Sequence, residues 1–79
     1  TYLPDLDVLS EERRSALVSA INALPDNYRQ IIKMRHEDEL DYMQIAEMLS
    51  LPLGTVKAHL FRARKMLQDS LRQNKHLFV

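Results

Sequence analysis

Five apolar residues near the C-terminal end of the chain constrain its fold more than any other feature. They follow one another at intervals of four, three, four and four residues: Val56, Leu60, Ala63, Leu67 and Leu71. Because successive residues of an α-helix are about 100° apart, this spacing places all five side chains on one stripe. The sequence therefore predicts a helix from about Gly54 to Leu71 with one buried face.

Three earlier segments also have helical patterns, over about residues 11–23, 26–36 and 42–49. Ser10 can cap the first helix, and Pro25 ends it and suits the first turn of the second. Asp41, with Gln44 three residues later, forms a capping-box pattern at the start of the third. The residues expected to lie on the inward faces of these helices are Ala16, Leu17, Ala20, Ile21, Leu24, Tyr28, Ile31, Ile32, Arg35, Ile45, Ala46 and Leu49.

The order of these elements predicts the fold class. The chain has one glycine and no strand-like alternation, so helices are the regular structure that it supports. A short helix, a turn over 50–53 around Pro52 and a longer helix form the helix-turn-helix pattern. We expect an all-α, four-helix domain of the winged-helix-like DNA-binding superfamily, without a wing. The expected domain spans 10–73, between a linker end at 1–9 and a tail at 74–79.

The composition excludes several classes of protein. The chain has no cysteine, so no disulfide, thiolate metal site or cysteine nucleophile is available. No apolar run approaches the roughly 20 residues that span a bilayer, and the first residues lack the pattern of a signal peptide. Leu40 stands where a zinc-protease helix beginning at His36 would need its second histidine. We expect no enzymatic activity, metal, cofactor, membrane or small-molecule substrate, and we expect His36, His59 and His76 to be isolated residues at the surface or its boundary.

The charges are unevenly distributed, although the formal net charge is zero. Residues 1–53 carry five basic and ten acidic side chains, whereas residues 54–79 carry six basic side chains and one acidic side chain. The last predicted helix is therefore the basic element of the chain. Such a helix is either a solvated surface or a phosphate-binding surface, because DNA binding depends on local positive charge.

The apolar stripe also defines which residues the last predicted helix turns outward. The side opposite the stripe holds Ala58, Phe61, Arg62 and Lys65, with Thr55 and Lys57 beside it and His59 and Arg64 nearer the core edge. Arginine can donate two hydrogen bonds to guanine, and apolar groups can contact thymine methyls. Phe61 is unusual on a solvated face and indicates a contact surface, for DNA or for a protein. Thr55 could bind a phosphate or cap the helix.

Short runs of residues between Leu24 and Arg64 give further evidence about the function of the chain. They are Leu24-Pro25, Tyr28-Arg29, Leu40-Asp41-Tyr42, Gln44-Ile45-Ala46-Glu47, Leu51 to Lys57 and Phe61-Arg62-Ala63-Arg64. With these runs, residues from about 10 to 71 resemble region 4 of bacterial sigma factors of the extracytoplasmic-function (ECF) group. The resemblance implies a cytoplasmic domain that binds the minus-35 promoter element and docks on the flap of the RNA polymerase beta subunit. It also implies an anti-sigma factor as a partner.

The resemblance assigns roles to individual residues. It implies base contacts by Lys57, Ala58, Phe61 and Arg62, and DNA-backbone contacts by Tyr42, Thr55, His59 and Arg64, to which the helical wheel adds Lys65. Two residues depart from the family pattern. Ala58 stands where serine is frequent, and His59 where arginine is common. One hydrogen bond and one phosphate charge are thereby missing, so we expect the isolated domain to bind DNA weakly.

Two alternatives to a sigma-factor domain fit parts of the sequence. The DNA-binding domain of LuxR-type response regulators also has an Ile-Ala pair before its turn and a Thr-Val-Lys start to its recognition helix. The residues that favour the sigma pattern are Leu53-Gly54 before this start and the run from Phe61 to Arg64 after it. A protein-interaction module is the other alternative, in which Phe61 and the apolar stripes serve mainly an anti-sigma factor or the polymerase.

Overall fold

The computed structural model describes residues 10–74, and within this range it contains helices and no strand. The elements are α1 (Glu11–Asn22), α2 (Asp26–His36), α3 (Tyr42–Leu49), α4 (Leu53–Leu71) and the short 3₁₀ helix η2 (Arg72–Asn74). The predicted all-α, four-helix fold is confirmed, and the predicted helix bounds agree with the observed ones within one residue. The predicted linker end at 1–9 and residues 75–79 of the predicted tail lie outside the described residues.

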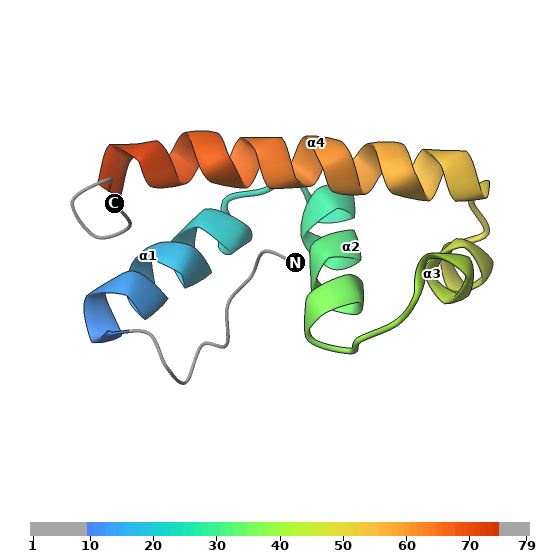
Figure 1. Cartoon of the computed structure of the whole chain (residues 1–79), viewed down its shortest axis with the longest axis horizontal. Coiled ribbons are helices and arrows are strands. Elements are labelled where there is room, and N and C mark those ends of the chain that lie inside the picture. The colour runs from blue at the N-terminus through green and yellow to red at the C-terminus, as the bar shows by residue number, and fades with distance from the viewer. Residues whose placement is uncertain (1–9, 75–79) are drawn as a thin grey trace.

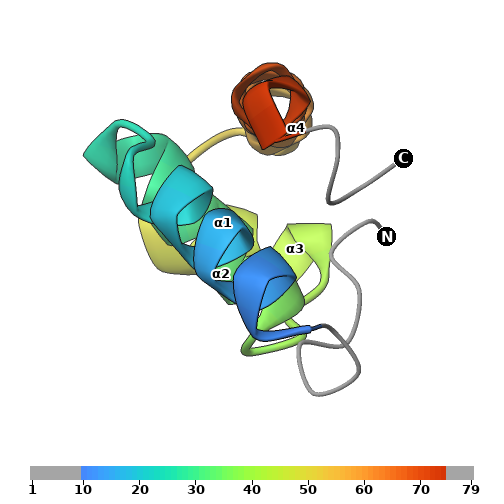
Figure 2. The ribbon, with the colours of Figure 1, turned by 90° about the vertical axis from the view of Figure 1, so that its left-hand side faces the viewer.

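Helix α4 is the longest element, and the other three helices pack against it. Figure 1 shows α4 along the whole length of the molecule, with α1 beneath its C-terminal half, α2 near its middle and α3 near its first residues. Viewed nearly along the axis of α4, the other helices all lie on one side of it (Figure 2). One side of α4 therefore builds the core, and the other is not covered by any described helix.

The core is apolar throughout the described residues, because no polar or charged side chain there is buried. Its centre consists of fully buried aliphatic residues from all four α-helices: Leu17, Ile31, Ile32, Ile45, Val56 and Leu60. Four residues of the predicted α4 stripe are buried, and Leu71 is half-buried at its end. Met34 is also buried, although the sequence analysis did not place it in the core. Conversely, Ala16, Ala46 and Leu49 are only half-buried, because they lie at the edges of the inward faces.

Local hydrogen bonds fix where α1 and α3 begin. The Arg13 backbone N–H donates to Ser10 Oγ at 3.2 Å, which confirms the predicted cap of α1. The capping box of α3 is complete, since Gln44 N–H donates to Asp41 Oδ1 at 2.8 Å and Asp41 N–H donates to Gln44 Oε1 at 2.9 Å. Pro25 takes the N-cap position of α2 and so stands one residue before its first turn.

The turn between α3 and α4 depends on one residue with a left-handed backbone. Ser50 has φ 54° and ψ 44°, which reverses the chain direction at the end of α3. The next N–H, of Leu51, then donates to the Ala46 carbonyl at 2.9 Å, and Pro52 precedes the first residue of α4. A left-handed conformation favours glycine over residues that carry a Cβ atom. Ser50 is therefore a strained position in the helix-turn-helix.

Replacing this strained residue by glycine should stabilise the fold. We expect Ser50→Gly to raise the free energy of unfolding by about 0.5–1 kcal/mol, because glycine adopts positive φ at no steric cost. Urea unfolding followed by circular dichroism measures this change. The matched control Ser50→Ala keeps the Cβ atom and should give no gain; equal midpoints for the two variants would contradict the prediction.

Candidate nucleic-acid interface

The uncovered side of α4 carries the residues that the helical wheel turns outward. Phe61 is 69% exposed, and Lys57, Arg62 and Lys65 are also exposed. Ala58 is half-buried beside them. No other described helix lies over this side of α4 (Figure 2). The result is a surface of three cations around one large aromatic ring, and an exposed ring of this size is typical of a contact surface.

The first turn of α4 lies beside this surface and has no side-chain cap. Pro52 occupies the N-cap position, and no side chain accepts a hydrogen bond from the first turn. Thr55 stands inside the helix as its third residue, so it does not cap α4 as one alternative in the sequence analysis proposed. Around Gly54, no atom from another part of residues 10–74 lies within 4 Å of the position that a Cβ atom would take. The backbone of this turn is therefore open to a close external contact.

Two predicted site residues of α4 lie instead at its inner edge, against α2. The ring of His59 meets the ring of Tyr28 edge-to-face, with ring centroids 5.4 Å apart. Arg64 Nη2 lies 3.5 Å from His36 Nε2 at the end of α2. The expectation that both histidines are isolated is thus wrong. They flank the inward faces of helices that pack together, and this brings each ring against a side chain of the other helix.

Arg64 belongs to a cluster that joins three helices and that we call the interhelical cluster: Arg35 and His36 of α2, Tyr42 of α3 and Arg64 of α4. The guanidinium carbon of Arg35 lies 5.7 Å from the centre of the Tyr42 ring, and Arg35 Nη1 donates to the Leu40 carbonyl at 3.5 Å. Within residues 10–74, neither arginine pairs with a carboxylate, and the Nε atom of each is buried without a hydrogen-bond partner. The cluster is therefore rich in positive charge and has unused donors.

The positive charge of the cluster changes the protonation of its other members. Burial, followed by repulsion from Arg64 and Arg35, lowers the pKa of His36 from 6.5 to about 4. Hydrogen bonding from the Arg64 side chain is the main cause that lowers the pKa of the Tyr42 hydroxyl. At neutral pH, His36 is consequently uncharged. Both shifts show that this region favours negative charge over positive charge.

Sequence reasoning assigned Tyr42 and Arg64 to the site but did not connect Arg35 and His36 with them. The sequence analysis places Arg35 on the inward face of α2, and it treats His36 as an isolated residue at the surface or its boundary that lacks the second histidine of a zinc site. Both residues lie at the C-terminal end of α2, and the sequence alone does not show which helices pack against that end. The basic run Arg35-His36 at the end of α2 was the available sequence signal.

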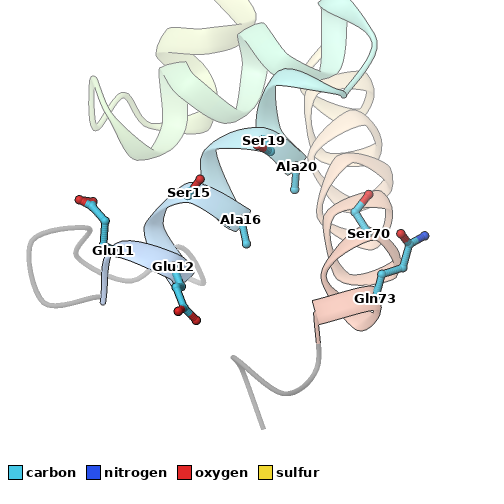
Figure 3. A pocket seen from close by; sticks show the side chains of 8 residues that line it. All are labelled: Glu11, Glu12, Ser15, Ala16, Ser19, Ala20, Ser70 and Gln73. Atoms are coloured by element: carbon cyan, nitrogen blue, oxygen red, sulfur yellow. The ribbon is translucent and has the colours of Figure 1, made fainter.

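A cleft at the other end of α4 has different chemistry. It has a volume of about 620 Å³ and lies between α1 and the last residues of α4 and η2 (Figure 3). Its lining consists of carboxylates, hydroxyls, an amide and small residues: Glu11, Glu12, Ser15, Ala16, Ser19, Ala20, Ser70 and Gln73. Two carboxylates at its rim would repel a phosphate backbone. The uncovered side and first half of α4 are therefore the candidate nucleic-acid interface.

Two other structural features are absent from residues 10–74. No group of three or more His, Cys, Asp or Glu side chains is arranged to hold a metal ion in this range. None of its helices combines the length and the hydropathy that a membrane crossing requires.

The arrangement of α3, the turn at Ser50 and α4 defines a class of protein. The long second helix leaves its basic side uncovered, as a recognition helix does when it enters the major groove, and this is a helix-turn-helix DNA-binding domain. Comparison with protein families gives the same class, since residues 14–67 match the family described as Sigma-70, region 4. The chain belongs to this family.

Full-length relatives support this membership. The chain is 40% identical over 70 residues to the ECF RNA polymerase sigma factor SigW of Bacillus subtilis (strain 168), covering 89% of this chain and 37% of that protein. It is 37% identical over 68 residues to the ECF RNA polymerase sigma-E factors of Salmonella typhimurium (strain 14028s / SGSC 2262) and Escherichia coli (strain K12), covering 86% of this chain and 36% of each relative. The chain thus spans little more than a third of these relatives. The predicted resemblance to ECF sigma factors is confirmed.

The shifted pKa of His36 predicts how stability depends on pH. Between about pH 6.5 and 4, an unfolded chain binds a proton at this ring whereas the folded chain does not, so the free energy of unfolding falls as the pH drops through this window. Solvent next to the half-buried ring screens the repulsion, and we expect a loss on the order of 1 kcal/mol. Urea unfolding at several pH values measures it. The control His36→Gln should lose less stability on acidification; parallel pH profiles for both proteins would contradict the assignment.

Proposed function

We propose that this chain binds the minus-35 element of promoter DNA as region 4 of an ECF RNA polymerase sigma factor. The observation that carries this proposal is the uncovered side of α4, where exposed Lys57, Arg62 and Lys65 surround Phe61. Membership in the sigma-70 region 4 family supports it. The relatives are named as ECF RNA polymerase sigma factors, and the chain covers 89% and 86% of its own length in matching them.

Four residues of α4 are proposed to contact base edges. Arg62 and Lys57 can donate hydrogen bonds to guanine O6 and N7 in the major groove. Ala58 and Phe61 lack such donors, and their apolar surfaces suit thymine methyl groups. The residues lie within two helical turns of one another, so one helix can present all four to successive base pairs. The set therefore consists of two side chains that can donate hydrogen bonds to bases and two that can contact thymine methyl groups.

Five further residues are proposed to contact the DNA backbone and so to fix the position of α4 in the groove. They are Tyr42, Thr55, His59, Arg64 and Lys65. Lys65 is exposed on the same side of α4 as Arg62. Thr55, His59 and Arg64 are half-buried on α4, and Tyr42 is half-buried at the start of α3. Contacts at the edges of a recognition helix suit phosphates, because the phosphates line both sides of the groove that holds the helix. Thr55 stands next to the open backbone at Gly54.

Core RNA polymerase is the proposed protein partner, through the flap of its beta subunit, and an anti-sigma factor is proposed as a competing partner. Support comes from exposed apolar side chains away from the α4 surface: Met43 and Met48 of α3 are 65% and 66% exposed. Exposed methionines suit protein contacts because the side chain is flexible and polarisable. A partner that also covers Phe61 would block DNA.

Arg62 provides the direct test of base reading. We expect Arg62→Ala to lower DNA affinity by about 1–3 kcal/mol and to relax base preference at one promoter position, because two hydrogen bonds to one base are lost. Selection of bound duplexes from a random pool, followed by binding measurements with single-base variants, gives both quantities. Arg72→Ala is the matched control, since Arg72 is an exposed arginine of η2 at the far end of the molecule. Unchanged discrimination in Arg62→Ala would overturn the assignment.

Gly54 tests whether DNA approaches the first turn of α4. Ala has a higher helix propensity, and no other part of the chain obstructs a Cβ atom here, so we expect Gly54→Ala to raise the free energy of unfolding by about 0.5–1 kcal/mol. The same methyl group should lower DNA affinity by about 1 kcal/mol or more, because it holds a phosphate away from the backbone N–H groups. Thermal unfolding and DNA titration of the same sample measure the two effects. A variant with both higher stability and full affinity would exclude this contact.

A further inference from the structure

We propose that His36 is a positioning residue for DNA binding: from α2, it holds the Arg64 guanidinium beside the Tyr42 hydroxyl, so that α4 and α3 bind one DNA phosphate together. This inference rests on the proposed function. It adds His36, which has no direct contact with DNA in that proposal. The observation that carries it is the contact between Arg64 Nη2 and His36 Nε2, at 3.5 Å.

The direction of this contact follows from the chemistry of the two side chains. A guanidinium group has five N–H donors and no acceptor, so His36 Nε2 must accept. His36 can accept only as a neutral ring with its proton on Nδ1. Burial and the two neighbouring arginines keep the ring neutral, since they lower its pKa to about 4. At neutral pH, His36 therefore acts as an uncharged acceptor that directs Arg64 without neutralising its charge.

A second neighbour of Arg64 indicates where His36 directs the guanidinium group. Hydrogen bonding from Arg64 is the main cause that lowers the pKa of the Tyr42 hydroxyl, with a smaller contribution from Arg35, whose guanidinium carbon lies 5.7 Å from the centre of the Tyr42 ring. Arg64 thus lies between a group of α2 and a group of α3. Both Tyr42 and Arg64 are half-buried, so each is accessible to a partner in part.

A phosphate group supplies the negative charge that the described residues of the interhelical cluster lack. Among the described residues, the charged groups that lower the pKa of His36 are Arg64 on α4 and Arg35 on its own helix, and both arginines also lower the pKa of Tyr42 on α3. Within the described residues no carboxylate pairs with either arginine, so their two positive charges have no counter-charge there. An anion accepts charge-assisted hydrogen bonds from arginine and a further one from the tyrosine hydroxyl. The DNA phosphodiester is the anion that the proposed function brings to this edge of α4.

Positioning matters because a free arginine side chain has many rotamers. Ordering such a side chain during binding costs affinity, and a side chain ordered beforehand avoids this cost. Removing the acceptor at His36 should therefore weaken DNA binding about threefold to tenfold without changing base preference. The effect must pass through Arg64, which makes it separable from a general loss of packing.

The experiment is a double-mutant cycle between His36 and Arg64 in DNA binding. His36→Leu removes the acceptor and keeps an apolar side chain, His36→Gln keeps an acceptor oxygen, and each is made with Arg64 and with Arg64→Ala. The probe is the duplex selected by the wild-type protein, titrated at several salt concentrations. We expect His36→Leu to lose threefold to tenfold in affinity and to have a shallower salt dependence, by about one counterion, as after loss of one phosphate contact. His36→Gln should retain most of the affinity, and His36→Leu should have no effect in the Arg64→Ala protein.

A second measurement needs no DNA. With 13C-labelled tyrosine rings, the titration of the Tyr42 hydroxyl can be followed by NMR in each variant. His36→Leu and Arg64→Ala should both raise the pKa of Tyr42 towards its ordinary value of 10.0, because both remove the oriented guanidinium. His36→Gln should raise it less. If His36→Leu does not fold, the comparison of His36→Gln with Arg64→Ala still tests the contact.

The outcomes separate this inference from the proposed function. If the wild-type protein selects no duplex and Arg62→Ala changes nothing, the proposed function fails and the role of His36 fails with it. If the wild-type protein binds a selected duplex but His36→Leu weakens it equally with and without Arg64, or leaves the pKa of Tyr42 unchanged, only the positioning role is overturned. A loss of DNA affinity that His36→Leu causes only when Arg64 is present supports the positioning role.

Discussion

The burial of one stripe of α4 against three other helices is the interaction on which the rest of the structure depends. Val56, Leu60 and Ala63 have no more than 1% of their surface exposed, and Leu67 has 5%. Since each of the other helices packs on this stripe, its apolar contacts hold α1, α2 and α3 in one domain. The stripe also sets the rotation of α4 about its own axis, so the same contacts that stabilise the fold decide which residues reach DNA.

Most of the fold could be predicted from the sequence because its signals are local. Capping residues such as Ser10 and Asp41, together with Pro25 and Pro52, lie at helix starts and determine the bounds directly. The degree of burial at the edge of a helix is different, since it depends on the neighbouring helix. Met34 is buried and Leu49 half-buried for this reason, and the periodicity of one helix contains no information about either.

The residues of the candidate site likewise differ in whether the sequence alone could identify them. The exposure of Phe61 and Arg62 follows from the apolar stripe of their own helix, so a helical wheel was sufficient to find them. The contact between His36 and Arg64 joins residues 28 positions apart on helices that cross. Spacing along either helix shows that each residue lies near the core edge, but the partner is determined by the crossing of α2 and α4. The interhelical cluster therefore became visible only in the fold.

The alternation of Arg62, Ala63 and Arg64 along α4 has a consequence for how this domain can evolve. Ala63 is fully buried on the stripe, whereas Arg62 faces outward and Arg64 points to the inner edge. A substitution of Arg62 changes the outward surface of α4 while the core stays intact, but any larger side chain at Ala63 must displace neighbouring helices. Consecutive residues of α4 are therefore subject to different structural constraints. If Arg62 contacts promoter bases as proposed, promoter preference can change without any accompanying change in the packing that keeps the domain folded.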